Sequence, residues 1–227
     1  MKNPQTSEKK LTSLLRKLKK EQPAEPEEFS DAVEVLVKSF LIWESTTIKA
    51  SAAYKRIMDQ IVDFNDLRVS MPQELVDWIG PRYPMALERS QRIRAALRHT
   101  YHREHSVSLK SLHGMGRREV RHYLRSMDGV APYVADRVTL LCFDAHCIPV
   151  DDRLQRSMVG AGVCDDSMTV ADLSSWLARQ VKAADAVPTH YALQAWSDSV
   201  GSGASGARST ARARSTRTKK KTAGARG

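Results

Sequence analysis

Apolar side chains recur every three or four residues through most of the chain, the spacing of amphipathic helices. One clear stripe follows Ser30, and a second follows Thr46 or Thr47. The same pattern predicts helices over residues 72–79, 85–101, 117–127, 132–143, 169–184 and 188–196. No run of alternating apolar and polar residues indicates a strand, so the sequence predicts an all-α fold.

The two ends of the chain differ from its middle. Leucines at helical spacing among lysines in residues 9–20 predict a basic amphipathic helix that docks loosely. Residues 201–227 hold eight basic side chains, no acidic one and no large apolar one. They are expected to be a disordered cationic tail, either an arm that binds phosphates or a solubilising end. We therefore divide the chain into residues 1–24, 25–200 and 201–227.

Positive charge is concentrated within the body as well. The formal net charge is +10, and residues 82–125 carry eleven basic against three acidic side chains. Such a run either is a solvated helix face or binds nucleic acid. Four arginines of one predicted helix are the candidates for phosphate contact: Arg117, Arg118, Arg121 and Arg125.

Several classes of protein are disfavoured. No apolar stretch approaches the roughly 20 residues of a membrane-spanning helix, and the polar first ten residues do not resemble a secretory signal. We therefore expect an intracellular protein. Three cysteines cannot form a disulfide framework, and His99, His102 and His105 lack an acidic cluster or cysteine pair that would favour zinc. Neither a metal nor a cofactor is expected.

A short connection joins two predicted helices at residues 127–132. Gly129 supplies the permissive backbone of a tight turn, Val130 can return to the core, and Pro132 suits the first turn of the next helix. The amino end of that helix has amides that could bind a phosphate oxygen. The sequence thus predicts a helix, a hairpin and a helix. Sixteen residues beyond Ala135, Asp151 and Asp152 enter a further helix.

The hairpin and the following aspartate together resemble the helix-hairpin-helix (HhH-GPD) DNA glycosylases, which include endonuclease III. Residues 127–135 match the position of that family's Leu-Pro-Gly-Val-Gly-x-Lys-Thr-Ala hairpin, and residues 150–153 that of its Val-Asp-Thr-His motif. Residues 117–124 look like the helix that leads into the hairpin. The resemblance covers residues 29–163, with weaker likeness to residue 199. It implies a two-lobed helical fold and a hairpin that binds DNA through Gly129, Val130 and Ala131.

The resemblance makes Asp151 the catalytic carboxylate. Breaking the bond between base and sugar develops positive charge on the sugar, which a fixed anion stabilises. Asp151 could also orient or deprotonate an attacking water. From the residues alone, Asp151 could instead simply be the N-cap of the helix that follows it.

Two features of the family are missing. Bifunctional members have a lysine nucleophile where this chain has Tyr133, and no lysine lies between Lys110 and Lys182. The resemblance therefore implies monofunctional base release by water. Tyr133 could stack on or bind an extruded base, or be a packed aromatic. The iron–sulfur cluster of many relatives needs four cysteines, which this chain lacks.

Other positions depart from the family pattern. The second hairpin glycine is Ala131, and Asp128 and Val134 replace a proline and a threonine. An acid at Asp128 is unfavourable near a phosphate unless it faces away. The family's glutamine that fills the gap left by a flipped base corresponds to Glu44; Trp43 or Glu44 could instead read the partner base.

Two functions are compatible with these residues. The first is a DNA glycosylase of base-excision repair that acts as a monomer on double-stranded DNA containing a damaged or mismatched base. The second is a catalytically inactive DNA-binding protein that kept the hairpin and the basic arms. Either would work in the bacterial cytoplasm at the nucleoid or in a eukaryotic nucleus.

Overall fold

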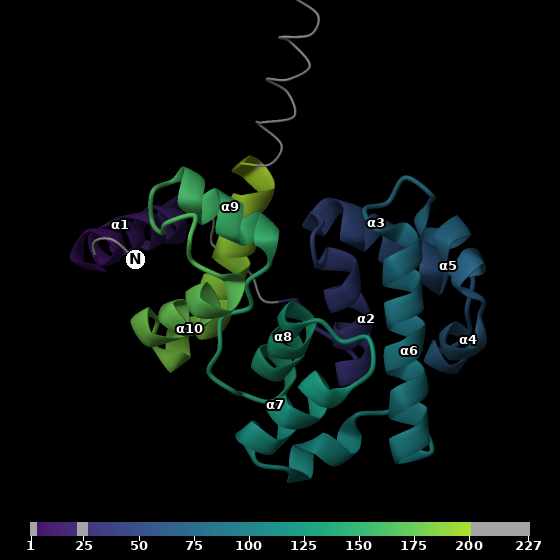
Figure 1. Cartoon of the computed structure of the whole chain (residues 1–227). Coiled ribbons are helices and arrows are strands. Elements are labelled where there is room, and N and C mark those ends of the chain that lie inside the picture. Colours follow the sequence, from purple (N-terminus) through teal and green to yellow (C-terminus); the bar gives the residue numbers. More distant parts are fainter. Residues whose placement is uncertain (1–3, 22–26, 201–227) are drawn as a thin grey trace, which may run out of the picture.

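The structure, a computed structural model, describes residues 4–21 and 27–200. Within them every regular element is a helix, so the all-α prediction is confirmed (Figure 1). The elements are α1 (Pro4–Glu21), α2 (Ala32–Ile42), α3 (Thr47–Met58), α4 (Phe64–Val69), α5 (Pro72–Ile79), α6 (Ala86–Glu104), η1 (Lys110–Gly114), α7 (Arg117–Ser126), α8 (Pro132–Cys142), α9 (Asp152–Gly160), α10 (Val170–Gln180) and η2 (Ala183–Asp185). A last helix covers residues 186–200.

Two separate hydrophobic cores divide the described residues into two lobes. The first lobe, residues 27–143, buries apolar side chains from α2 to α8. The second lobe combines α1 with residues 144–200, and its core also receives Leu140 from α8. Figure 1 shows α1, α9 and α10 together on one side and α2 to α6 on the other, with α7 and α8 between and below them. The expected two-lobed arrangement is therefore present.

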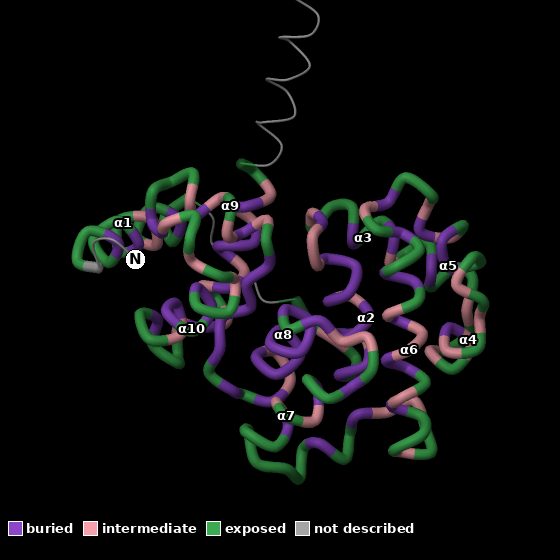
Figure 2. Tube along the Cα trace, in the orientation of Figure 1, coloured by how far each residue is buried: buried purple, intermediate pink, exposed green. Residues whose placement is uncertain are grey.

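Helix α8 is the central element. Every residue from Tyr133 to Leu140 is buried, and the helix packs against α2 and against α7. Figure 2 shows this helix buried on nearly every side. Because the hairpin between α7 and α8 is tied to this core, it occupies a fixed place in the fold.

Side-chain caps set where several helices begin. The Asp31 carboxylate accepts hydrogen bonds from two N–H groups at the start of α2, and Thr46 and Thr169 cap α3 and α10. Helix α5 begins at Pro72 and ends before Gly80, whose φ is +96°. These boundaries match the sequence prediction.

Some expectations were wrong. The helix expected to run to residue 184 ends at Gln180, and the last helix is longer than predicted. The short elements α4 and η1 were missed. Helix α1 does not dock loosely, since Leu11 and Leu18 are each only 2% exposed in the second core. The predicted cationic tail and residues 1–3 and 22–24 of the amino-terminal segment lie outside the described residues.

Candidate active site and nucleic-acid interface

The hairpin turn between α7 and α8 requires glycine at position 129. Gly129 has a φ of +79°, and a Cβ atom there would lie 2.9 Å from the carbonyl oxygen of Arg92 on α6. The Val130 N–H closes the turn by donating to the Met127 carbonyl at 3.2 Å. Arg92 Nη1 donates to the Gly129 carbonyl at 3.1 Å. The turn is therefore held against α6 and cannot move outward without losing these contacts.

The three predicted DNA-binding residues of the hairpin differ in exposure. Gly129 and Val130 are half-buried, whereas Ala131 is 5% exposed and is the N-cap of α8 without a side-chain hydrogen bond. Asp128 and Pro132, on either side, are exposed. The surface that the hairpin offers to a ligand is thus mainly residues 128–130 and Pro132.

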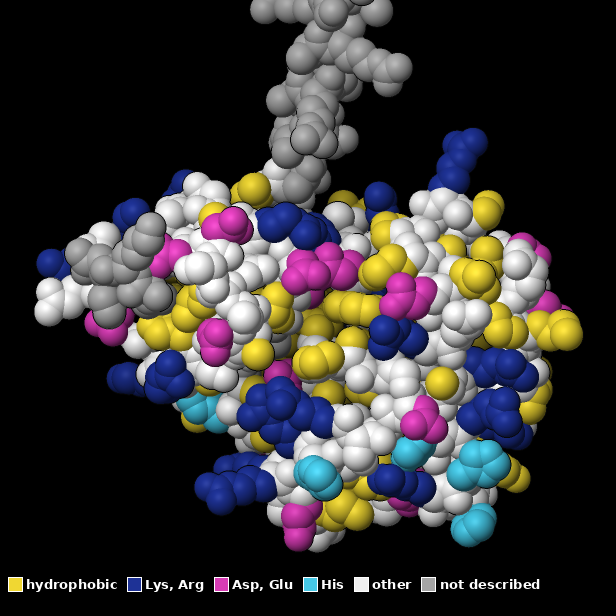
Figure 3. Space-filling view, viewed as in Figure 1, with side chains coloured by type: hydrophobic (Ala, Val, Ile, Leu, Met, Phe, Trp, Pro, Cys, Tyr) yellow, Lys and Arg dark blue, Asp and Glu magenta, His cyan; other side chains and the backbone are white. Residues whose placement is uncertain are grey.

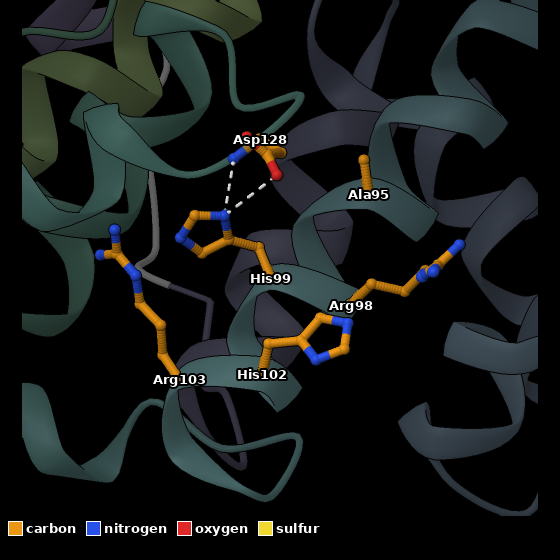
Figure 4. A pocket seen from close by; sticks show the side chains of 6 residues that line it. All are labelled: Ala95, Arg98, His99, His102, Arg103 and Asp128. Atoms are coloured by element: carbon orange, nitrogen blue, oxygen red, sulfur yellow. Dashed lines mark hydrogen bonds and ion pairs between the residues drawn. The ribbon is translucent and has the colours of Figure 1, made fainter.

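A hollow of about 490 Å³ lies between α6 and the hairpin. In Figure 4 the His99 ring is directed at Asp128, and the Arg98 side chain turns away from both. His99 Nδ1 is 3.3 Å from the Asp128 carboxylate and 3.3 Å from the Asp128 N–H. The Asp128 carboxylate therefore faces α6. The hollow is lined by Ala95, Arg98, His99, His102, Arg103 and Asp128.

The four candidate arginines of α7 fall into two pairs. Arg121 and Arg125 both bind the buried carboxylate of Asp136 on α8, at 3.1 and 3.0 Å. Arg117 and Arg118, in the first turn, are exposed and form no ion pair with another described residue. Figure 3 shows basic side chains and histidines gathered on the same face, over α7 and the lower end of α6. Of these four arginines, Arg121 and Arg125 are therefore the two that already bind a carboxylate of the described residues.

Asp151 is buried at the boundary between the lobes. It is 3% exposed and is the N-cap of α9, where Oδ1 accepts from Leu154 N–H at 2.9 Å. Its second oxygen, Oδ2, accepts from Glu44 N–H at 3.0 Å. Asp151 is thus an N-cap, as the simpler interpretation held, but it also bonds to the opposite lobe, which a cap does not require.

Glu44 lies in the turn between α2 and α3 with a left-handed φ of +52°. Its side chain crosses to the second lobe, where Oε1 accepts from Asp152 N–H at 2.7 Å and Oε2 lies 3.4 Å from Arg156. Each lobe therefore donates an N–H to a carboxylate of the other: Glu44 to Asp151, and Asp152 to Glu44. This reciprocal pair fixes the α2–α3 turn on the amino end of α9.

A second set of contacts joins the same elements. Arg153 donates to the Ser45 carbonyl and binds Asp198 of the last helix at 3.0 Å. Asp198 also accepts from Thr47 N–H at 2.8 Å. The α2–α3 turn of the first lobe is consequently joined by polar contacts to α9 and the last helix of the second lobe.

The two carboxylates of this site have raised pKa values. Burial raises the pKa of Asp151, while its backbone hydrogen bonds from Leu154 and Glu44 and the charge of Arg153 oppose that rise. Burial also raises the pKa of Glu44, and the charge of Asp151 raises it further. Two neighbouring acids with raised pKa values in a partly desolvated place are typical of sites for acid–base chemistry.

Tyr133 is packed inside the protein. It is 3% exposed, and its hydroxyl donates to Gln194 Oε1 of the last helix at 3.1 Å. Burial raises its pKa, with the charges of Asp151 and Asp198 acting in the same direction. The amino end of α8 therefore lies near Asp151. Of the two roles considered for Tyr133, the structure shows the packed aromatic side chain. Its contact with a base stays a prediction.

Trp43, which precedes Glu44, is half-buried and stacks with two arginines of α6. Arg89 and Arg92 lie 5.8 and 5.2 Å from the ring centroid. The carbonyl of Trp43 accepts from Arg89 Nη2 at 2.7 Å. Trp43 and Glu44 are thus beside Asp151, as the resemblance implied, but whether they contact DNA is still a prediction.

The described residues contain no group of three or more His, Cys, Asp or Glu side chains arranged to hold a metal ion. Burial raises the pKa values of Cys142 and Cys147 to about 12.

None of the helices in the described part of the chain is long and apolar enough to cross a membrane.

The sequence interpretation missed several residues that shape the site. Asp136 neutralises two of the proposed phosphate-binding arginines, Arg153 and Asp198 connect the lobes, and Arg89 lies beneath the α2–α3 turn. Asp136 carried one usable signal, because a charged residue on the apolar face of a helix is rarely buried without a partner. The contacts of Asp198 and Arg89 depend on residues far apart in the chain and left no local pattern.

Comparison with solved structures identifies the fold. A trapped endonuclease III–DNA covalent intermediate superposes with a TM-score of 0.66 at 17% identity, covering 82% of this chain and 84% of that one. A thermostable thymine-DNA glycosylase gives 0.61 at 16% identity, covering 85% and 87%. The Clostridium acetobutylicum 8-oxoguanine glycosylase/lyase with double-stranded DNA gives 0.63 at 14% identity, covering 85% and 69%.

This chain has the fold of the helix-hairpin-helix DNA glycosylases. A scan against protein-family models finds no match, and a sequence search of curated proteins finds none either. The helix-hairpin-helix glycosylase fold is therefore retained here at a sequence identity too low to carry activity or substrate over from the matched structures.

Proposed function

We propose that this protein is a DNA glycosylase that releases a damaged or mismatched base from double-stranded DNA, with Asp151 as the catalytic carboxylate. The observation that carries this proposal is the setting of Asp151. It is a buried carboxylate held by one N–H from each lobe, in a fold whose solved examples include DNA glycosylases. A cap that served only α9 would need the Leu154 contact alone.

The chemistry follows from the charge that base release creates. The sugar becomes positively charged as the bond to the base breaks. A carboxylate about 4 Å from that charge contributes about 4 kcal/mol at an effective dielectric near 20, which corresponds to roughly a thousandfold in rate. The neighbouring Glu44 is a second carboxylate in this site, and its pKa is raised by burial and by the charge of Asp151.

The DNA backbone would run along the hairpin face. Residues 128–130 and Pro132 would meet one strand. Arg117 and Arg118, exposed at the amino end of α7 and without an ion pair to another described residue, would add positive charge for the phosphates. Because the Asp128 carboxylate faces His99, it is directed away from a phosphate at the turn. Trp43 and Glu44 would lie beside the extruded base. The protein would act as a monomer, at the nucleoid of a bacterium or in a nucleus.

Base release would be monofunctional. Tyr133 stands where bifunctional relatives have lysine, and its buried hydroxyl is bonded to Gln194. The sequence has no lysine between Lys110 and Lys182 that could replace it. We therefore expect DNA strands to break only after alkali treatment, and breakage without alkali would contradict this mechanism.

The second candidate is a DNA-binding protein without glycosylase activity. It is favoured by the low exposure of Asp151 and by the Glu44 side chain, which crosses the amino end of α9. For chemistry to occur, the Glu44 side chain must leave Asp152 when DNA binds. If it does not, the protein would bind duplexes but release no base.

One experiment separates the two candidates. The full-length protein is incubated with duplexes that carry uracil, alkylated purines, oxidised pyrimidines or oxidised guanine, and strands are analysed after alkali. A glycosylase cleaves at least one duplex at the lesion. Asp151→Asn should abolish this cleavage and barely change duplex affinity, whereas no cleavage by the wild type identifies the inactive DNA-binding protein.

Asp152→Asn is the matched control, because Asp152 is the adjacent acid, is exposed, and has its backbone N–H, not its carboxylate, in the contact with Glu44. Asn is a good N-cap, so Asp151→Asn should keep α9. It offers one acceptor oxygen to two N–H groups, however, and we expect a loss of about 1–2 kcal/mol in unfolding free energy. Circular dichroism during urea unfolding checks that both variants remain folded.

A further inference from the structure

Arg89 of α6 is a fully buried cation. Its exposed fraction is 0%, and no carboxylate of the described residues lies within ion-pair distance. Its guanidinium instead lies over the Tyr83 ring, at 5.2 Å, and over the Trp43 ring. Nε donates to the Pro84 carbonyl at 3.2 Å, and Nη1 has no hydrogen-bond partner among the residues that the structure describes. Burying an arginine in this way is costly, so its position calls for a physical reason.

The strongest contact of Arg89 points to that reason. Nη2 donates to the Trp43 carbonyl at 2.7 Å. The Trp43 carbonyl and the Glu44 N–H belong to the same peptide group, and that N–H donates to Asp151 Oδ2 at 3.0 Å. One peptide group is therefore bound at its oxygen by a buried cation and at its N–H by the buried carboxylate.

Such an arrangement has two physical effects. The hydrogen bond at the oxygen polarises the peptide and strengthens the N–H as a donor to the carboxylate. It also fixes the orientation of the peptide, which adjoins the unfavourable left-handed backbone of Glu44. Both effects favour the ionised form of Asp151.

We propose that Arg89 is a positioning residue for Asp151: acting through the Trp43–Glu44 peptide, it keeps the carboxylate ionised and oriented. The effect on Asp151 stands on the geometry alone, and only its consequence for base release rests on the proposed function. Other ionisable groups surround Asp151. The charges of Arg153 and Asp152 of α9 act on its pKa, and its own charge acts on Glu44 of the α2–α3 turn and on Tyr133 of α8. Asp198 of the last helix acts on Tyr133.

The first test measures the pKa of Asp151 directly, by a ¹³C NMR titration of its carboxyl carbon, assigned with Asp151→Asn. Arg89→Met and Arg89→Gln should each raise this pKa by about one pH unit, since the cation is lost. Arg89→Lys, which keeps the charge, should stay nearest to the wild type. An unchanged pKa in either neutral variant, with the protein folded, overturns the proposal.

Arg92→Met is the matched control, because Arg92 lies on the same helix and stacks on the same Trp43 ring but binds Glu88 and the Gly129 carbonyl. It should leave the pKa of Asp151 unchanged, and an equal rise overturns the proposal. If neither neutral Arg89 variant folds, the wild type decides. The NMR signals of its Glu44 amide and Trp43 carbonyl must change with pH at the pKa of Asp151. If they do not, the proposed action of Arg89 through this peptide is contradicted.

The second test uses base release. In Arg89→Gln the acidic limb of the profile of kcat/KM against pH should move to higher pH by the same amount, with KM nearly unchanged. If no base is released from any duplex but the pKa of Asp151 rises in the NMR titration, the proposed function fails and the role of Arg89 stands. Base release with an unshifted profile overturns the role of Arg89 alone.

Discussion

Asp136 and Asp151 are equally buried, at 3% exposure each, yet their surroundings differ. Asp136, on α8, is bound by the guanidinium groups of Arg121 and Arg125. Asp151, at the start of α9, is bound by two backbone N–H groups and has a second carboxylate, Glu44, beside it. The first aspartate is neutralised by direct ion pairs, whereas the carboxylate of the second forms no ion pair with another described residue.

This difference separates a structural acid from a candidate catalytic one. The ion pairs of Asp136 hold α7 to α8 and so fix the hairpin. The negative charge of Asp136 is balanced by the two arginines in that contact. Backbone N–H groups orient a carboxylate without cancelling its charge, which leaves it able to stabilise a developing cation. Burial alone would not have distinguished the two.

The largest expected effect is on base release. Asp151→Asn should lower the rate by about a thousandfold, because the anion beneath the sugar is lost. Asp136→Asn removes an equally buried charge and should leave the rate within a few-fold of the wild type. Single-turnover measurements on the most responsive lesion duplex check both. Equal losses in the two variants would mean that burial of an acid, and not its position, sets the activity.

The second effect is on stability and concerns Asp136. Replacing Arg121 and Arg125 together by alanine leaves a buried carboxylate without a cation, and we expect the unfolding free energy to fall by about 3 kcal/mol. Urea unfolding followed by circular dichroism measures the change. Since Arg117 and Arg118 bind no described carboxylate, replacing them should change stability by no more than about 0.5 kcal/mol. A similar loss in both double variants would contradict the division of the α7 arginines.

The third effect is on DNA affinity. Replacing Arg117 and Arg118 by alanine removes from the amino end of α7 two cations that form no ion pair with a described residue, so the slope of log K against log salt should become less steep by roughly 1.8. Titrations of one undamaged duplex at several salt concentrations test this. An unchanged slope would place the DNA backbone elsewhere on the molecule.

The smallest effect is a change in how stability depends on pH. The pKa of Glu44 is raised in the folded protein, so the folded state binds a proton more tightly than the unfolded chain does. Stability from this group is present below the ordinary pKa of 4.5 and is lost as the pH rises through the folded value. Glu44→Gln should therefore reduce, by a few degrees in Tm, the loss that the wild type shows as the pH rises above 4.5.

The exposed Glu28 is the control for that experiment. Glu28→Gln should leave the pH dependence of Tm as it is in the wild type. If Glu44→Gln also leaves it unchanged, the pKa of Glu44 is not raised in the folded protein.

Most of the fold could be predicted from local signals. Helical periodicity, Pro72 and Gly80, and the caps at Thr46 and Thr169 located the helices, because these features act within one or two turns. The short α4 was missed since six residues carry too little periodicity. The close docking of α1 could not be seen, because the partners of Leu11 and Leu18 lie more than a hundred residues away.

The site was predictable in part. The resemblance located Asp151, Glu44 and the Gly129 turn, each of which has a local motif. The pairing of Arg121 with Asp136 could have been anticipated only with knowledge of how α7 packs on α8. The Arg89 contact joins residues 46 positions apart through the backbone carbonyl of residue 43. Because every residue type has this carbonyl, the sequence did not indicate the contact.

The burial of α1 in the second core has a consequence for how the chain folds. The first lobe is built from one continuous segment and can form as soon as that segment leaves the ribosome. The second lobe needs α1, which precedes the first lobe in the chain, and residues 144–200, which follow it. Leu11 and Leu18 would therefore lack their final partners until residues 144–200 are synthesised, and lysines beside such apolar residues oppose aggregation.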